Sequence, residues 1–109
     1  MNPPKKVRIG HAFFDVKTDP ATVLDLATNN NSGESDGNRL VLKVRPDYPF
    51  QTVAETLLHE ILHMCLFVTG TDQMLEDDVE EKVVRPMAMA LFGVLRDNPK
   101  LVQFLTSQE

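Results

Sequence analysis

The side chains best suited to chemistry in this sequence lie in one short run, His59-Glu60-Ile61-Leu62-His63. This run has the H-E-x-x-H pattern, in which two histidines and a glutamate stand at fixed spacing. In a helix, His59 and His63 would lie one turn apart and roughly 40° from each other, because each residue turns the helix by about 100°. Two imidazoles so placed can bind one zinc ion, and Glu60 can reach a water molecule bound to that ion.

The alternative interpretation is that these are two helix histidines with polar partners and a surface glutamate. A pattern of three fixed residues can arise by chance, so the surrounding sequence has to decide. Phe50 to Thr69 contains no Gly or Pro, and apolar residues recur through it at helical spacing. An imidazole on such a half-apolar helix needs a partner. This context favours a metal site with one zinc ion per chain.

Length and charge restrict the classes of protein to which this chain can belong. It has 109 residues, of which 42% are hydrophobic, and a formal net charge of −5. We therefore expect a single globular domain, 1–109, with a modest core. The acidic balance argues against binding to a nucleic-acid backbone. Cys65 is the one cysteine, so it cannot form an internal disulfide, and we interpret it as a small buried residue.

The sequence pattern also predicts where the protein is found. The basic residues Lys5, Lys6 and Arg8 are not followed by an apolar run, so we expect no signal peptide. We expect no stretch of membrane-spanning length either. The prediction is a cytoplasmic protein without a membrane partner, whose oligomeric state is left open.

The residues before the motif predict strands and a short helix. Val7–Val16 has mostly strand-like spacing, with a bulge at Gly10. His11 would lie on this strand, either as an ordinary sheet histidine or as a helper near the metal. Asp19-Pro20 would start a helix over 21–28.

A polar loop and a second strand should follow that helix. Asn29–Asn38 is rich in Asn, Ser, Gly and Asp, and predicts a turn or mobile loop. Arg39–Arg45 alternates between apolar and other residues, as a half-buried strand does. A free edge at Leu40–Val44 would suit the addition of an extended peptide.

Three helices are expected from the motif onward. Thr52–Glu55 has the form of a capping box, which predicts a helix that starts near Thr52 and stops at Gly70. A second long helix is expected over Val79–Arg96, disturbed at Pro86, and a short last one over Pro99–Thr106. We interpret three methionines as core filling: Met74, Met87 and Met89. The fold class is α+β, with a small antiparallel or mixed sheet packed on the active-site helix and a second backing helix.

A catalytic zinc site requires a third protein ligand, and the acids that precede the second helix are the candidates. They are Glu76, Asp77, Asp78, Glu80 and Glu81. The apolar stripe of the second helix slightly favours Glu80 and does not exclude Glu81. The alternative for each acid is a solvated charge that stabilises the helix N-terminus.

Two runs of residues carry a resemblance to a known class of enzyme. The motif followed by Glu81-Lys82-Val83-Val84 resembles the gluzincin metallopeptidases. With Leu95-Arg96-Asp97-Asn98-Pro99, the residues from about 39 to 105 resemble small phage- and prophage-encoded proteins of the ImmA/IrrE type. This resemblance implies a minimal zincin-like domain, Glu81 as the third ligand in preference to Glu80, and, for a phage protein, the cytoplasm of a bacterial host.

The leading functional prediction is a zinc metalloendopeptidase that cleaves a protein or peptide substrate. His59, His63 and Glu81 would hold the metal, and Glu60 would be the general base for a zinc-activated water. The oxyanion donor is left open among three residues, and Asp77 or Asp78 would orient a histidine. The three candidate donors are His11, Tyr48 and Arg85. The alternative is a catalytically inactive zinc-binding phage protein that binds a host or phage partner; a transcriptional regulator ranks below both.

Overall fold

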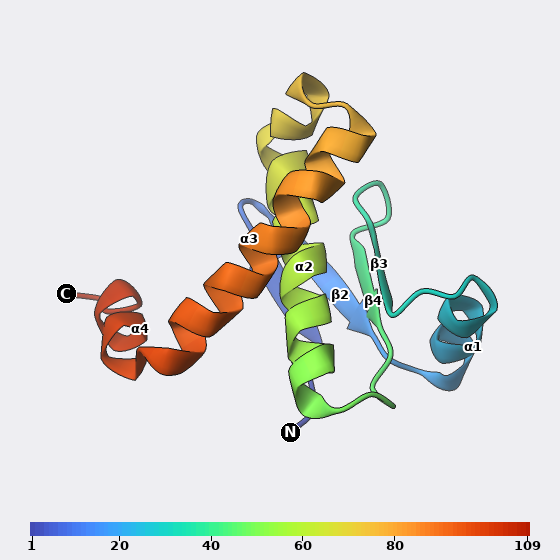
Figure 1. The fold of residues 1–109 in the computed structure, drawn as a ribbon, viewed down its shortest axis with the longest axis horizontal. Helices are drawn as coiled ribbons and strands as arrows, with labels where there is room; N and C mark the ends of the chain where they lie inside the picture. Colours follow the sequence, from blue (N-terminus) through green and yellow to red (C-terminus); the bar gives the residue numbers. More distant parts are fainter.

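The computed structural model describes residues 1–109 and has an α+β architecture with one small mixed sheet (Figure 1). The strands are β1 (Lys6–Ile9), β2 (Ala12–Lys17), β3 (Gly33–Asp36) and β4 (Val41–Val44). The helices are α1 (Pro20–Thr28), α2 (Phe50–Thr69), the short 3₁₀ helix η1 (Thr71–Met74), α3 (Asp77–Asp97) and α4 (Pro99–Leu105). The α+β class predicted from the sequence is confirmed.

The sheet has the strand order β1-β2-β4-β3, so β1 and β3 are its edges. β2 and β4 run parallel, and the other two pairs are antiparallel. β4 lies inside the sheet, and the expectation of a free edge at Leu40–Val44 is therefore wrong. The edge strand on this side of the sheet is β3, which packs against α2.

The expected single strand over Val7–Val16 is in fact a hairpin of β1 and β2. Ile9 pairs with Ala12, and Gly10 takes a φ of +61° between them. A glycine with positive φ at the first central position is typical of the tight type II′ hairpin turn. His11 is the second turn residue and is exposed, so it does not lie on a strand.

The polar segment Asn29–Asn38 contains β3, so the expectation of a loop over its whole length is wrong. β3 has no apolar alternation because it is a short edge strand of polar residues. The turn into β4 is closed by Asp36, whose carboxylate accepts hydrogen bonds from the backbone N–H groups of Asn38 (3.0 Å) and Arg39 (3.1 Å). Arg39 therefore belongs to the turn, and β4 begins two residues later.

The helix that carries the motif is longer at its start than the sequence suggests. α2 begins at Phe50, after Pro49, and no side chain caps it, so the expected capping box at Thr52 is wrong. Its end at Gly70, with a φ of 77°, is confirmed. Contrary to expectation, α2 is long and apolar enough to cross a membrane by length and composition alone. A core helix meets the same criteria.

The core lies between the sheet and one face of α2. Phe14, Leu42 and Val44 are fully buried from the sheet side. Facing them, α2 contributes apolar residues at helical spacing. These residues are Val53, Leu57 and Met64. Cys65, also on α2, is half-buried and packs against this core.

The C-terminal helices contribute less to the core than expected. α3 forms as predicted and continues through Pro86, but only Val84 and Ala88 on it are buried. α4 has no buried residue, and 77% of Phe104 is exposed. The interpretation of three methionines as core filling is wrong, since all are more than half exposed. They are Met74, Met87 and Met89; the methionine in the core is Met64.

We expect Leu42→Ala to lower the free energy of unfolding by about 2–5 kcal/mol, because it opens a cavity at a fully buried site. Leu24→Ala is the matched control, since Leu24 is 69% exposed, and it should change that free energy by less than about 0.5 kcal/mol. Urea titration followed by circular dichroism measures both. Equal losses in the two variants would contradict the assignment of the core.

Candidate metal centre

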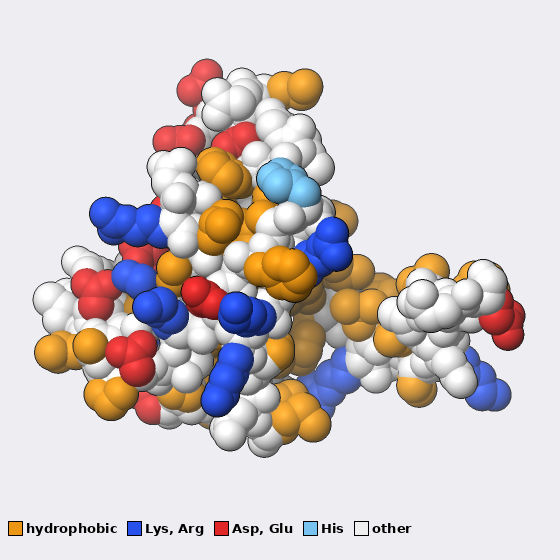
Figure 2. Space-filling model, turned by 180° about the vertical axis from the view of Figure 1, so that it is seen from behind, with side chains coloured by type: hydrophobic (Ala, Val, Ile, Leu, Met, Phe, Trp, Pro, Cys, Tyr) orange, Lys and Arg blue, Asp and Glu red, His pale blue; other side chains and the backbone are white.

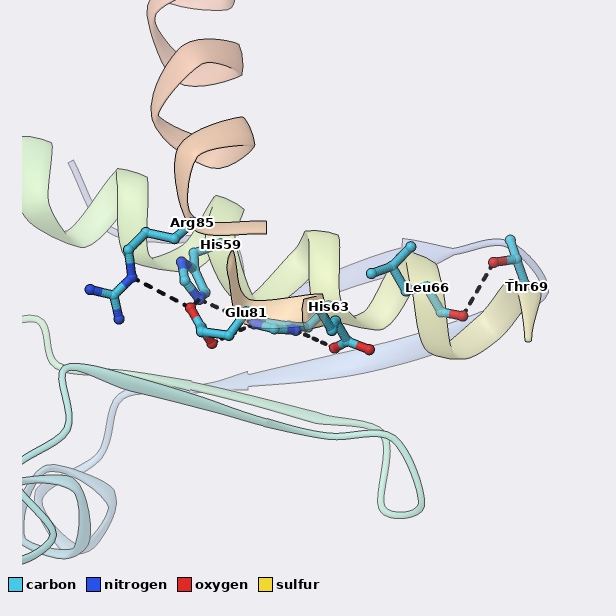
Figure 3. A network of polar contacts seen from close by, with 7 residues as sticks. His59, His63, Leu66, Thr69, Glu81 and Arg85 are labelled. Atoms are coloured by element: carbon cyan, nitrogen blue, oxygen red, sulfur yellow. Dashed lines mark hydrogen bonds and ion pairs between the residues drawn. The ribbon is translucent and has the colours of Figure 1, made fainter. Parts of the chain in front are cut away.

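The packing of α3 against α2 brings the motif close to the acids at the start of α3. Gly70 and η1 reverse the chain after α2, and α3 returns along it with Val84 and Ala88 buried at the contact. Glu81 is three residues before Val84 and so lies on the same face of α3. This face is turned toward His59 and His63 (Figure 3).

Four donor atoms of three side chains converge on one point between the two helices. The Nε2 atoms of His59 and His63 are 3.1 Å apart. Glu81 Oε1 is 3.0 Å from His59 Nε2, and Glu81 Oε2 is 3.1 Å from His63 Nε2. A tetrahedral zinc ion with bonds of about 2.0–2.1 Å holds its ligand atoms about 3.3 Å from one another. The separations in this cluster are close to that value.

The surroundings of Glu81 fit a cation between its carboxylate and the imidazoles. Its Oε1 atom is buried and has no hydrogen-bond partner, although His59 Nε2 lies 3.0 Å away. Arg85 Nε lies 3.6 Å from the same oxygen, at ion-pair distance. A buried carboxylate oxygen that accepts no hydrogen bond is costly, and a metal ion among these atoms would satisfy it. Two imidazoles and one carboxylate are a donor set that fits zinc.

Glu80 contacts the opposite nitrogen of one of these imidazoles. Its Oε2 atom lies 2.5 Å from His63 Nδ1, and both side chains are largely buried, at 14% and 17% exposure. In the tautomer that donates Nδ1–H to the Glu80 carboxylate, Nε2 of His63 keeps its lone pair free for a metal. A carboxylate in this position orients a metal-binding histidine. The structure therefore places Glu81 among the Nε2 atoms and Glu80 behind His63.

The other acids of this turn lie apart from the imidazoles. Asp78 is exposed and lies 3.8 Å from Lys82 Nζ, and Asp77 is also exposed. Neither makes a hydrogen bond or ion pair with His59 or His63. The contact expected from Asp77 or Asp78 is thus made by Glu80, which the apolar stripe of α3 had predicted only as a metal ligand.

Glu60 occupies a different face of α2 from the two histidines. It stands in line with the core residues Leu57 and Met64 and is 9% exposed. Burial raises the pKa of Glu60, and a hydrogen bond from the Ser35 hydroxyl opposes the rise. Because Ser35 lies on β3, the carboxylate is directed to the gap between α2 and the edge of the sheet.

Gly33 lets β3 approach the helix closely at this gap. A Cβ atom at residue 33 would lie 2.5 Å from Thr56 Cγ2 and 3.4 Å from Glu60 Cγ. The first of these distances is a clash, so this part of β3 requires a glycine. Its sequence signal is an isolated Gly in a polar segment, which on its own also fits a loop.

A cleft of about 520 Å³ opens on one side of the cluster. His59, Glu60 and Glu81 line it, and His63 does not. Most other lining residues are polar and come from the segment before β3 and from α2: Asn30, Asn31, Ser32, Thr52, Glu55 and Thr56. The candidate metal centre therefore has an accessible side, next to the carboxylate of Glu60.

Only one of the three expected oxyanion donors is near this cleft. Arg85 lines it from α3. Tyr48 instead packs under the guanidinium of Arg45, 4.8 Å from the ring centre, and His11 lies in the β1–β2 turn. Neither Tyr48 nor His11 lines the cleft.

Comparison with protein-family models, with curated proteins and with solved structures found no match to this chain. The resemblance to gluzincin metallopeptidases therefore stays a prediction. The centre itself consists of two imidazoles and one carboxylate whose ligand atoms lie within 4.8 Å of one another.

We expect Glu80→Ala to weaken zinc binding about 10- to 100-fold, because the His63 ring loses the acceptor that orients it. Competition with a chromophoric chelator measures the dissociation constant. Asp78→Ala is the matched control, an acid of the same helical turn that lies away from the imidazoles, and it should leave the constant within about twofold. Equal effects of the two substitutions would rule out the orienting role of Glu80.

Proposed function

We propose that this protein is a zinc-dependent metallopeptidase acting on a protein or peptide in the cytoplasm. The observation that supports this most is the convergence of His59, His63 and Glu81 on one point beside the buried carboxylate of Glu60, at an open cleft. Zinc held by these three residues would polarise the peptide carbonyl and lower the pKa of a bound water.

In the proposed reaction Glu60 transfers protons. Its carboxylate takes a proton from the water that attacks the carbonyl carbon and delivers it to the amide nitrogen, which leaves as an amine. Its position supports this role, because the side chain lines the cleft next to His59 yet is only 9% exposed. The low exposure keeps the carboxylate in one place and limits competing hydration.

Arg85 is the residue best placed to stabilise the oxyanion. It lies one helical turn after Glu81 on α3 and lines the cleft. Its Nε is 3.6 Å from Glu81 Oε1, while 72% of its side chain is exposed. The guanidinium therefore has donors left to direct at the negative charge that develops on the carbonyl oxygen.

The edge strand β3 offers a template for the substrate backbone. Arg45 N donates to Ser32 O, so the alternation of an antiparallel pair directs the N–H and C=O groups of Gly33 and Ser35 away from β4. An extended peptide can pair with such an edge by strand addition. Gly33 also lines the cleft, which would bring a peptide paired there to Glu60.

One feature favours the second candidate function, a zinc-binding protein that binds a partner without cleaving it. α4 and the end of α3 project from the body as an arm (Figure 1). Figure 2 shows apolar side chains over this arm. The exposed large apolar residues of α4 are Leu101, Phe104 and Leu105. Exposed apolar patches of this kind are typical of interaction sites.

We expect Glu60→Gln to keep zinc binding within about threefold and to lower peptide hydrolysis at least about 100-fold, because the amide cannot accept the proton. His59→Ala should instead lose zinc and hydrolysis together. Zinc content by atomic absorption and cleavage of an unfolded protein report the two properties. Full hydrolysis by the Glu60→Gln protein would exclude the general-base role, and zinc binding without any cleavage by the parent protein would favour the binding function.

A further inference from the structure

One carboxylate in the cleft has no role in the proposed reaction. Glu55 lies on α2, one helical turn before His59, and lines the cleft with it. It is half-buried and makes no hydrogen bond or ion pair with any residue. The other two carboxylates of the cleft are assigned, Glu60 to proton transfer and Glu81 to the metal.

The remaining lining residues leave Glu55 as the main charge available to a ligand. The cleft has one cation, Arg85, which is assigned to the oxyanion in the proposed reaction. The other groups are neutral polar side chains and one apolar residue, Met89. A half-buried carboxylate without a partner favours a cation there, since partial burial reduces its hydration and strengthens its attraction to a positive charge.

We propose that the cleft selects peptides with a lysine or arginine close to the scissile bond, and that Glu55 binds this basic side chain. The inference rests on the proposed function, because it takes the cleft to be the place where the peptide lies. Met89 can cover the aliphatic stem of such a side chain, as apolar surface commonly does for Lys and Arg. A large apolar side chain would find no apolar pocket in this polar lining.

The spacing on α2 limits where the basic residue can stand in the peptide. Residues four apart on a helix have Cβ atoms about 5–6 Å from each other, so Glu55 lies about that far from His59. An extended peptide rises about 3.3 Å per residue. The recognised lysine or arginine should therefore lie within about two positions of the scissile bond.

The experiment uses quenched fluorescent peptides of one sequence with Lys, norleucine or Glu at a single position, scanned over two residues on each side of the expected cleavage point. The zinc-loaded parent protein should cleave the best Lys peptide with kcat/KM about tenfold above its norleucine match. Glu55→Gln should reduce this preference to about twofold, mainly by slowing cleavage of the Lys peptide, and Glu55→Lys should shift it toward the Glu peptide. Asp97→Asn removes the same charge from an exposed position outside the cleft and should keep the parent preference.

A binding measurement separates this inference from the proposed function. Fluorescence anisotropy of the same peptides with the zinc-loaded Glu60→Gln protein should show the same order of dissociation constants. Equal binding and equal cleavage of Lys and norleucine peptides would overturn the role of Glu55 and leave the peptidase intact. A Lys preference in binding, lost in a Glu55→Gln/Glu60→Gln protein, with no cleavage by the parent would support Glu55 and overturn the peptidase.

Discussion

The centre depends on one electrostatic constraint, the meeting of two imidazole nitrogens and a carboxylate at a single point between two helices. Each of these atoms presents electron density to the others at 3.0–3.1 Å, which is favourable only with a proton or a cation among them. Glu80 fixes which nitrogen of His63 takes part. Of the residues of α3, only Val84 and Ala88 are fully buried. A bound divalent ion would therefore also hold the two helices together.

The long helices could be predicted from the sequence because their apolar residues repeat at helical spacing over five turns or more. The strands and turns in the first half of the chain were harder to predict from the sequence, and the physical reason differs from one segment to the next. Gly10 reverses the chain through a positive φ, which composition alone does not distinguish from a bulge. β3 is a strand because β4 offers it a partner, and its own polar residues show no alternation. Such long-range pairing outweighs local propensity in short edge strands.

The site was partly predictable for a similar reason. The spacing of His59 and His63 follows from the geometry of one helix, so local sequence is enough to place them together. Whether Glu80 or Glu81 faces them depends on how α3 is rotated about its own axis against α2. The apolar stripe of α3 leaves two such rotations open, because several of its residues are exposed. The roles of Gly33 and Glu55 could not be predicted, because they depend on the cleft, whose lining residues come from segments distant in the chain.

The position of Glu81 near the start of α3 determines how far this residue moves when the projecting arm moves. Glu81 is three residues from Val84, about 4.5 Å along the helix axis, whereas Asp97 is thirteen residues away on the other side, about 20 Å. Seen from Val84, the expected metal ligand Glu81 therefore lies much closer along α3 than the end of the helix at Asp97 does. A tilt that swings Asp97 by about 4 Å displaces Glu81 by only about 1 Å. If α3 tilts as a rigid body about Val84, a displacement of the arm is reduced about fourfold at Glu81, beside the imidazoles.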